Sequence, residues 1–175
     1  FKAFAKAGCI CAVETQTRPQ QIEPDLWLYF APIKRNAMEY VIQKASELGA
    51  AVLQPINTQH TQIDHLNIER LQHIATEAAE QCERLTLPRI KDAMKLKEAI
   101  THLPADRPLL FCAESGTTQP IAKALQAPAP QGLSWKKAII IVGPEGGFSR
   151  DEVLLLSALP QAVAASLGPR ILRAD

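Results

Sequence analysis

The sequence is poor in aromatic residues and carries almost no net charge. Aromatic side chains make up 5% of the 175 residues and hydrophobic residues 47%, so the core has to be built mainly from Ala, Val, Ile and Leu. The chain has nineteen Lys and Arg side chains and eighteen Asp and Glu side chains. A nucleic-acid-binding domain is usually clearly basic, so this balance does not indicate one, although a local basic patch is enough to contact phosphates.

Patterns for metal binding and membrane insertion are missing as well. Cys9, Cys11, Cys82 and Cys112 form no CxxC pair and have no His at zinc-ligand spacing, so no metal site is predicted. We expect all four cysteines to be reduced, and Cys82 and Cys112 to pack as small hydrophobic side chains. No signal peptide and no apolar run of membrane-spanning length is found, which favours a cytoplasmic protein without a membrane partner.

Segments typical of strands and helices alternate from residue 26 onward. Continuous apolar runs predict strands at 26–31, 51–56, 108–114, 137–143 and 161–168. The segments that predict helices between them are 36–48, 67–84, 118–126 and one beginning at Arg150. This alternation indicates an α/β fold with a largely parallel sheet flanked by helices.

Local signals mark where the helices begin, where they end and which side faces the core. Capping boxes are predicted for Asn36 with Glu39 and for Ser149 with Glu152, and Gly49 is placed to end the first helix. The side chains expected to face inward are Ala37, Val41, Ala45 and Leu48 on the first helix, and Leu71, Ile74, Ala75, Ala78 and Cys82 on the second.

Residues 1–22 differ from the rest of the chain. They hold one strand-like segment, CICAVE, followed by a polar stretch, and they are too short to hold a core alone. We interpret them as the last part of a small β domain plus a linker, and residues 23–175 as the main domain.

The most informative segment is the glycine-rich stretch 143–147. It links the end of a predicted strand to a predicted helix N-terminus, which is where open α/β sheets bind ligands. Its three glycines let the backbone approach a ligand closely, although a tight turn without a ligand is an equally open alternative. The motifs G-x-G-x-x-G and G-K-[ST] are absent, and the carboxylate of Glu145 would repel a polyphosphate.

Basic side chains gather near two other turns. Arg170 and Arg173 follow the strand that ends at Gly168, and a helix there would place them on one face near 143–147. Paired guanidinium groups suit phosphate or carboxylate recognition, but arginines alone more often form a solvated patch. Gln81, Arg84 and Arg89 gather at the turn after the 67–84 helix.

Four segments, taken together and in this order along the chain, form a specific pattern. They are KRNAMEYVIQKASELG (34–49), EAAEQCERLTLPRI (77–90), VGPEGGFSRDE (142–152) and LGPRILRAD (167–175). Together they resemble the RsmE-type ribosomal RNA uridine-N3 methyltransferases, which belong to the SPOUT class and have a trefoil-knotted α/β fold. The resemblance covers about residues 26–175.

The resemblance implies S-adenosylmethionine as the cofactor, held by the three loops of the knot. The residues that would hold it are Phe111, Ala113, Glu114, Val142, Gly143, Pro144, Gly146, Gly147, Leu167, Gly168, Ile171 and Leu172. It also implies a homodimer that acts on 16S rRNA within the small (30S) ribosomal subunit. Residues 1–22 would then be the remnant of a PUA-like RNA-binding β-barrel, and the helix that threads the knot would lie beyond Asp175.

The implied reaction sets a demand on the site, because N3 of uridine carries a proton at neutral pH. The site must stabilise a uridinate-like anion or supply a base, while alignment does most of the remaining work. We expect Arg84 and Arg170 to contact the base anion, and Glu145 to orient an arginine or act as the base. The side chains expected to contact RNA are Lys34, Arg35, Arg89 and Arg173.

One segment departs from the family pattern. Where the family commonly has a TERS-like strand end, this chain has Thr58-Gln59-His60-Thr61, which removes an Arg that contacts RNA or the dimer partner. His60 can still donate a hydrogen bond, but the histidines are otherwise given no catalytic role. The alternatives are another SPOUT methyltransferase acting on tRNA or a ribose 2′-hydroxyl, and a catalytically silent RNA-binding or assembly protein. A doubly wound nucleotide-binding domain is disfavoured by the missing phosphate motifs.

Overall fold

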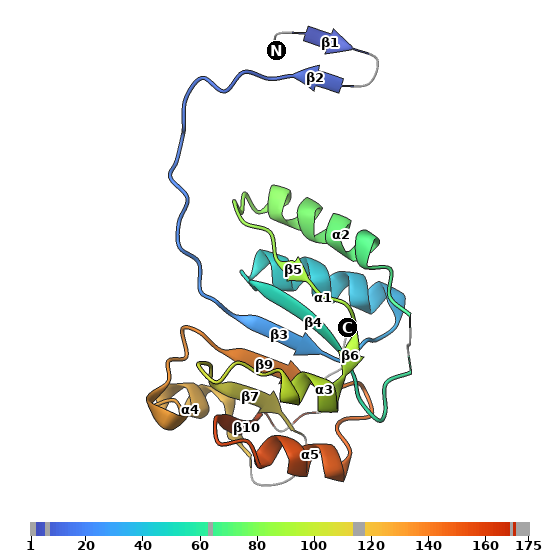
Figure 1. Ribbon diagram of the computed structural model, residues 1–175, viewed down its shortest axis with the longest axis vertical. Helices are drawn as coiled ribbons and strands as arrows, with labels where there is room; N and C mark the ends of the chain where they lie inside the picture. Colours follow the sequence, from blue (N-terminus) through green and yellow to red (C-terminus); the bar gives the residue numbers. More distant parts are fainter. Residues whose placement is uncertain (1–2, 6–7, 63–64, 114–117, 169, 171–175) are drawn as a thin grey trace.

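The main domain is built on one parallel sheet. The computed structural model describes residues 3–5, 8–62, 65–113, 118–168 and 170, and for Arg35 and residues 3–5 and 8–10 only the backbone. Across the sheet the strands are β5 (Arg89–Ile90), β4 (Val52–Asn57), β3 (Trp27–Phe30), β9 (Ile139–Val142), β7 (Leu109–Cys112), β10 (Ala162–Ser166) and β8 (Gln119–Pro120), and β6 (Met94–Lys95) pairs with the end of β4. All these pairings are parallel (Figure 1).

Helices cover both faces of this sheet. One face packs against α1 (Arg35–Glu47), α2 (Ile68–Gln81) and α4 (Ile121–Gln126), and the other against α3 (Leu96–Thr101) and α5 (Arg150–Ser157). A short 3-10 turn, Pro130–Gly132, follows α4. The expected α/β fold with a largely parallel sheet flanked by helices is therefore confirmed.

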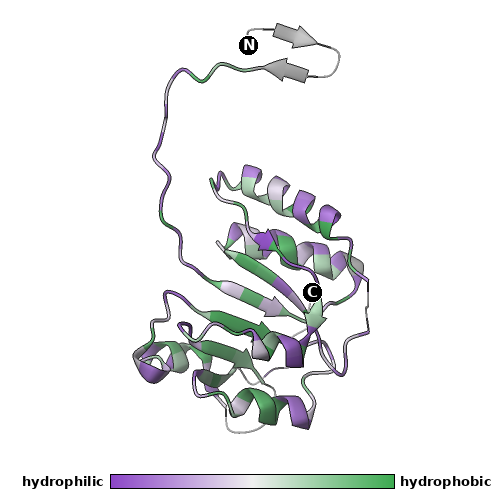
Figure 2. Cartoon of the chain, viewed as in Figure 1, coloured by the Kyte–Doolittle hydropathy of each residue, from purple (hydrophilic) through white to green (hydrophobic). Residues whose placement is uncertain are grey.

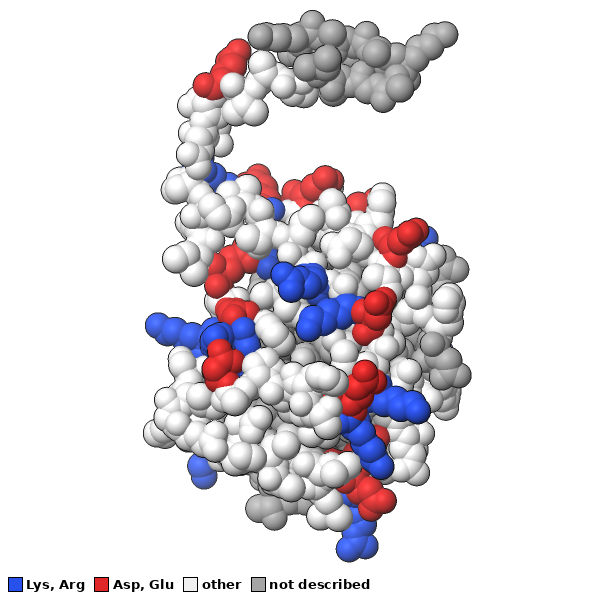
Figure 3. All heavy atoms as spheres, in the orientation of Figure 1, with Lys and Arg blue, Asp and Glu red and all other residues white. Residues whose placement is uncertain are grey.

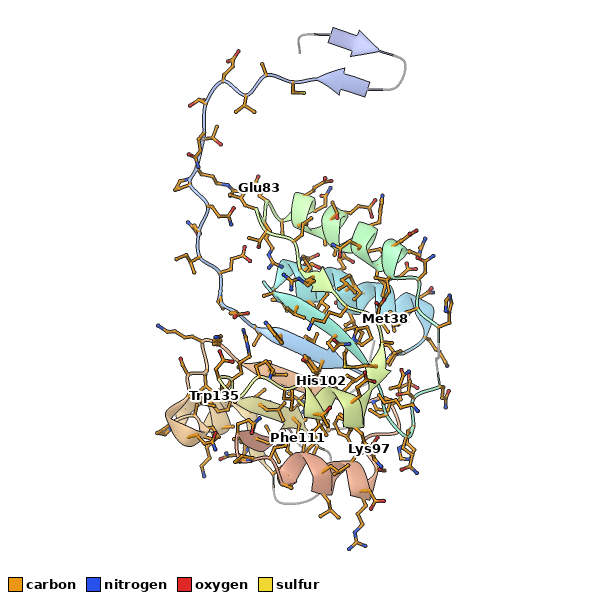
Figure 4. The ribbon with its side chains drawn as sticks, in the orientation of Figure 1. Met38, Glu83, Lys97, His102, Phe111 and Trp135 are labelled. Carbon is orange, nitrogen blue, oxygen red and sulfur yellow. The ribbon has the colours of Figure 1, made fainter. Side chains whose placement is uncertain are left out.

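The core is mainly aliphatic, as the composition predicts. Residues such as Ile42, Leu53 and Ile141 are fully buried, and Phe111 is the largest of the fully buried side chains in the described part of the chain. Figure 2 shows hydrophobic strands inside and hydrophilic positions on the outer sides of the helices. Phe111 packs with Leu96 of α3 and Leu156 of α5, and Figure 4 shows it between the sheet and these helices.

The predicted helix signals hold in part. Ser149 and Glu152 form a complete capping box, and Gly49 has the left-handed φ of +88° that ends α1. The capping box predicted at Asn36 is wrong, because α1 begins one residue earlier after Lys34, which makes no side-chain cap. Glu39 instead pairs with Arg70 of α2 at 2.7 Å.

Two expectations about burial are wrong. Leu48 is 84% exposed because α1 ends at Glu47 and the buried side of the helix is formed by Met38, Ile42 and Ala45. Cys82 is exposed because α2 ends at Gln81, before the next inward turn.

Short elements were not predicted. The helix α3 and the strands β5, β6 and β8 have two to six residues each, too few to show a helical or strand period.

Two ion pairs fix the chain where it enters the sheet. The Arg84 side chain is 6% exposed; it donates to Glu23 and to the carbonyls of Ser46 and Ala50. The equally buried Arg107 pairs with Asp25 and lies 4.0 Å from the Trp27 ring. Both pairs lie at the amino ends of the strands, and they hold the segment that leads into β3.

The segment before this point is simple. Strands β1 (Ala3–Ala5) and β2 (Gly8–Ile10) form an antiparallel pair, and residues 11–26 contain no helix or strand. The interpretation of residues 1–22 as a barrel remnant stays a prediction. Among the helices described, none is long and apolar enough to cross a bilayer.

Replacing Arg84 with Ala should lower the free energy of unfolding by about 2 kcal/mol or more. The change removes the ion pair to the Glu23 carboxylate and the guanidinium hydrogen bonds to the carbonyls of Ser46 and Ala50, at a place where the Arg84 side chain is buried. Urea denaturation followed by circular dichroism measures the change. Arg18→Ala is the matched control, since Arg18 makes an exposed pair with Glu83 and its loss should matter much less. Equal effects of both substitutions would contradict the view that Arg84 holds the segment leading into β3.

Acidification should weaken the same edge. Desolvation raises the pKa of Glu23, but hydrogen bonds from Arg84 and Thr86 outweigh it, so the pKa lies below the ordinary 4.5. The hydrogen bond from Arg107 holds the pKa of Asp25 below 3.8. Because both folded-state values are depressed, the stabilisation is present above the ordinary values and is lost as the pH falls through the folded ones.

The double variant Glu23→Gln/Asp25→Asn should therefore lose less stability than the wild type between neutral pH and about pH 3. Urea midpoints measured across that range test this expectation. The exposed Glu80 of α2 offers a control, and Glu80→Gln should leave the pH dependence unchanged. Parallel pH profiles for the wild type and the double variant would show that these carboxylates do not act in this way.

Candidate functional site

The strand order gathers the glycine-rich loop and its neighbours at one edge. Because all strands are parallel, the loops after β3 (31–34), β4 (58–62) and β9 (143–149) leave the sheet at the same side. The ends of β7 and β10 lie on the far side of β9. The loop after β9 thus stands between two sets of strand ends, where open α/β sheets bind ligands.

The 143–149 loop is a tight turn that needs its glycines. The backbone N–H of Gly147 donates to the carbonyl of Pro144 at 2.8 Å, and Gly147 has φ +66°. A Cβ on Gly143 would lie 3.2 Å from the Phe148 ring. The sequence therefore keeps side chains out of the loop where the backbone turns back on itself.

Glu152 joins this loop to the one after β4. Its buried carboxylate accepts hydrogen bonds from the backbone N–H of Ser149 at 2.9 Å and of Gln59 at 2.8 Å. The first bond belongs to the capping box, and the second crosses from α5 to the end of β4. One side chain thereby fixes the relative position of two loops.

His60 makes the next contact between the same two loops. Its ring Nδ1 lies 3.0 Å from the carbonyl oxygen of Gly146 and 3.1 Å from that of Gly147. A Cβ on Gly146 would lie 3.2 Å from the His60 Cβ, so a side chain at this position would crowd the contact. Thr61 supports the loop from within, because its hydroxyl accepts from the backbone N–H of Thr58 at 2.9 Å.

A cavity of about 520 Å³ opens between these loops. The residues that line it are Pro32, Ile33, Lys34, Gln59, His60, Thr61, Gln62, Pro144, Glu145 and Gly146. Lys34 and Glu145 give its wall one charge of each sign, and Ile33 and the prolines give it apolar surface. Such a mixture suits a flat polar ring better than a highly charged ligand.

The loop residues expected to bind the cofactor lie together. Val142, Gly143, Pro144, Gly146 and Gly147 form the end of β9 and its loop. Their cofactor role stays a prediction.

The neighbouring strand ends supply the rest of the described set. Ala113 is buried at the end of β7 and donates its N–H to Ala165 of β10, which leads to Leu167 and Gly168. Leu167 is exposed, and Gly168 has φ +120° with open space where a side chain would be. Glu114, Ile171, Leu172 and Arg173 lie outside the described residues.

The cofactor contact expected at Phe111 would come from its backbone. The Phe111 side chain is 1% exposed and packs in the core beneath α3 and α5. The cofactor role of Phe111 stays a prediction. The neighbouring Cys112 is partly buried, and burial raises the pKa of its thiol, which keeps it protonated near neutral pH.

The expected arginines do not all reach this edge. Arg84 and Arg89 lie at the amino ends of the strands, where Arg84 is fully engaged and Arg89 begins the edge strand β5. The structure therefore places them away from the 143–147 loop, and Arg84 instead binds Glu23 and the carbonyls of Ser46 and Ala50. Arg170 is exposed just beyond Gly168, Lys34 lines the cavity, and the side chain of Arg35 lies outside the described part.

Glu145 is exposed on the cavity wall. Within the described part of the chain its carboxylate makes no ion pair, so the orientation of an arginine by Glu145 stays a prediction. Acidic and basic side chains alternate over the face shown in Figure 3 rather than forming one large patch of either sign. No group of three potential metal ligands is found among the described residues.

Sequence reasoning missed how the loop after β4 meets the loop after β9. His60 was expected to donate a hydrogen bond, but its contact with 146–147 and the bond from Gln59 to Glu152 were not predicted, because the strand order that brings β4 and β9 to one edge cannot be read from local patterns. The available signal was the position of 58–62 directly after a buried strand.

Comparison with protein families decides the relationship of the chain. Residues 20–175 match the model of the family described as RNA methyltransferase domain. The chain belongs to this RNA methyltransferase family. The match includes every strand and helix of the main domain.

Curated relatives point the same way. The chain is 33% identical over 163 residues to the ribosomal RNA small subunit methyltransferase E of Rickettsia conorii, covering 93% of this chain and 64% of the relative. It is 30% identical over 169 residues to the protein of the same name from Synechocystis, covering 95% of this chain and 54% of the relative. The chain thus spans less than two thirds of the length of either protein.

Solved structures agree with the fold. A Legionella pneumophila protein in complex with the bound cofactor SAM is 27% identical, with a TM-score of 0.72 over 89% of this chain and 63% of that one. The ribosomal RNA small subunit methyltransferase E of Neisseria gonorrhoeae, bound to S-adenosyl methionine, gives a TM-score of 0.71 at 24% identity, over 85% of this chain and 60% of that one. At this identity the second likeness concerns the fold alone.

Glu152→Ala should loosen the site as well as the fold. The substitution leaves the partly buried N–H groups of Gln59 and Ser149 without an acceptor and should cost about 2 kcal/mol of unfolding free energy. Amide hydrogen exchange should rise in 58–62 and 143–149 together. The adjacent Asp151→Ala is the matched control, because Asp151 is exposed on the same helical turn. Faster exchange in only one of the two loops would show that Glu152 does not join them.

Proposed function

We propose that this protein transfers a methyl group from S-adenosylmethionine to N3 of a uridine in 16S rRNA of the small ribosomal subunit. The observation that carries the proposal is the glycine-rich loop 143–147, placed at the carboxyl edge between two sets of strand ends in an RNA methyltransferase domain. The resemblance in four ordered motifs and the names of the curated relatives support the choice of substrate.

The cofactor would lie on the side of β9 that faces β7 and β10. The backbone of 143–147, the exposed Leu167 and the open space above Gly168 fit a ligand with an adenine ring and a short polar tail. S-adenosylmethionine supplies an electrophilic methyl group. The loops would hold it in place through backbone groups and apolar contact, and a positively charged sulfonium tolerates the nearby Glu145 carboxylate better than a phosphate would.

The acceptor base would approach from the opposite side of the same loop. Lys34 lines the cavity and Arg170 is exposed just beyond Gly168, and both would contact phosphates of the RNA. Arg170 would also stabilise negative charge on the uracil oxygens. Glu145 would orient the uracil ring or a cationic side chain.

The assembled form is part of the proposal. We infer a homodimer in which the partner completes the RNA site, acting in the cytoplasm on small subunits. The small net charge of the chain fits an enzyme that binds its RNA through a local surface rather than a strongly basic domain.

Identification of the product nucleoside tests the proposal directly. Full-length protein incubated with labelled S-adenosylmethionine and unmodified small subunits should yield 3-methyluridine, detected by mass spectrometry of the digested rRNA. A 2′-O-methylated nucleoside, or labelling of tRNA alone, would assign the protein to another branch of the class. Cofactor binding without any product from rRNA or tRNA would favour the catalytically silent alternative.

Gly147→Val should weaken cofactor binding by about tenfold or more. A β-branched side chain is strained at φ +66° and would displace the turn on which the cofactor rests. Calorimetric titration with S-adenosylmethionine measures the affinity. The matched control is Gly132→Val, which has a similar φ of +69° in a distant turn with open space around it, and should lose similar stability but no affinity. Equal affinities of the two variants would argue against this loop as the cofactor site.

A further inference from the structure

No sequence motif assigns a role to the cavity beside the glycine-rich loop. It is bounded by the loops after β3, β4 and β9, whereas the proposed cofactor loops follow β7, β9 and β10. Only the loop after β9 belongs to both sets. A ligand in the cavity and a ligand on the β7 side would therefore meet across Glu145 and Gly146.

Backbone carbonyls determine which ring nitrogen of His60 carries the proton in this cavity. Carbonyl oxygens only accept hydrogen bonds, so the contacts at 3.0 and 3.1 Å to Gly146 and Gly147 require a proton on Nδ1. The bond made by one ring nitrogen sets the state of the other. In the neutral ring Nε2 is then the acceptor, on the side of the imidazole turned away from these two carbonyls.

We propose that the cavity receives the target uracil ring and that Nε2 of His60 removes its N3 proton. This inference rests on the proposed function and deepens it. The carbonyls of Gly146 and Gly147 would hold the imidazole in one orientation and stabilise the positive charge that it gains, as a carboxylate does in other base assemblies.

The size and the walls of the cavity agree with this role. About 520 Å³ is ample for one base with part of its ribose, and Ile33, Pro32 and Pro144 offer apolar surface to a flat ring. Gln59 and Gln62 offer amide groups to the two uracil carbonyls. The ionisable groups that share the cavity with His60 are Lys34 and Glu145, one from each neighbouring loop.

The step balances as a single displacement. The N3–H bond breaks and its proton forms a bond to Nε2 of His60. The electron pair left on N3 forms the bond to the methyl carbon, the carbon–sulfur bond breaks, and its pair stays on sulfur. The products are 3-methyluridine, S-adenosylhomocysteine and a protonated His60, which returns its proton to water. The methyl transfer itself then needs little beyond alignment.

The substitution His60→Asn distinguishes a catalytic role of His60 from a purely structural one. The Asn amide nitrogen occupies nearly the place of Nδ1 and can still donate to Gly146 and Gly147, but the variant has nothing in place of Nε2. We expect the single-turnover rate to fall by about 100-fold, within the usual contribution of a general base, while affinity for S-adenosylmethionine changes less than about threefold. His60→Ala should lose the rate and also weaken the cofactor loop. His73→Asn on the exposed side of α2 is the matched control and should leave both quantities unchanged.

A more acidic substrate should rescue the variant. Fluorine at C5 of uracil withdraws electrons and makes the N3 proton easier to remove, so subunits reconstituted with 5-fluorouridine-containing rRNA need the base less. We expect the rate ratio between wild type and His60→Asn to shrink at least tenfold on this RNA. A purely structural role of His60 would leave the ratio unchanged, and that result would overturn the assignment.

The state of the ring can be measured without turnover. Nitrogen-15 NMR of the free protein with labelled histidine, assigned by comparison with His60→Asn, should show His60 as the tautomer protonated on Nδ1. Protonation on Nε2 would overturn the inference, as would a rate of His60→Asn within about twofold of the wild type. If the wild-type protein itself makes no 3-methyluridine, the proposed function fails first, and the two failures are distinct.

Discussion

The Glu152 carboxylate joins two loops through its bond to Gln59, 93 residues away in the sequence, and the geometry of the site depends on it. It accepts from Ser149 within the cap of α5 and from Gln59 at the end of β4. With these loops in register, the His60 ring reaches the carbonyls of Gly146 and Gly147. A buried carboxylate bound only by backbone N–H groups is a rigid support, because neither donor can rotate away.

The two edges of the sheet do different work. At the amino edge, Arg84 and Arg107 are buried against carboxylates and carbonyls and hold the chain where it enters β3. At the carboxyl edge, side chains such as Lys34, His60 and Glu145 face a cavity. Stabilising charges are thus paired and enclosed, and the charges available to a ligand are exposed. Substitutions at one edge can act on stability without directly changing the contacts at the other.

Sequence patterns predicted what depends on neighbours along the chain. The strand runs, the capping box of Ser149 and the turn at the glycine-rich stretch all rest on local spacing, and the structure contains all three. The errors come from contacts across the fold. Arg84 was expected to contact the target base, but its side chain is enclosed at the amino edge of the sheet. His60 gained its place only because β3 alone separates β4 from β9.

Strand β9 lies at the centre of the sheet but is synthesised late. It pairs with β3 and β7, and 109 positions separate Phe30 at the end of β3 from Ile139 at the start of β9. At translation rates of about 5–20 residues per second, β3 emerges roughly 5–20 s before its central partner. During that interval one side of β3 is an open strand edge, which can pair with strands of other chains. The topology that builds the site therefore makes the nascent protein dependent on protection from aggregation until β9 inserts.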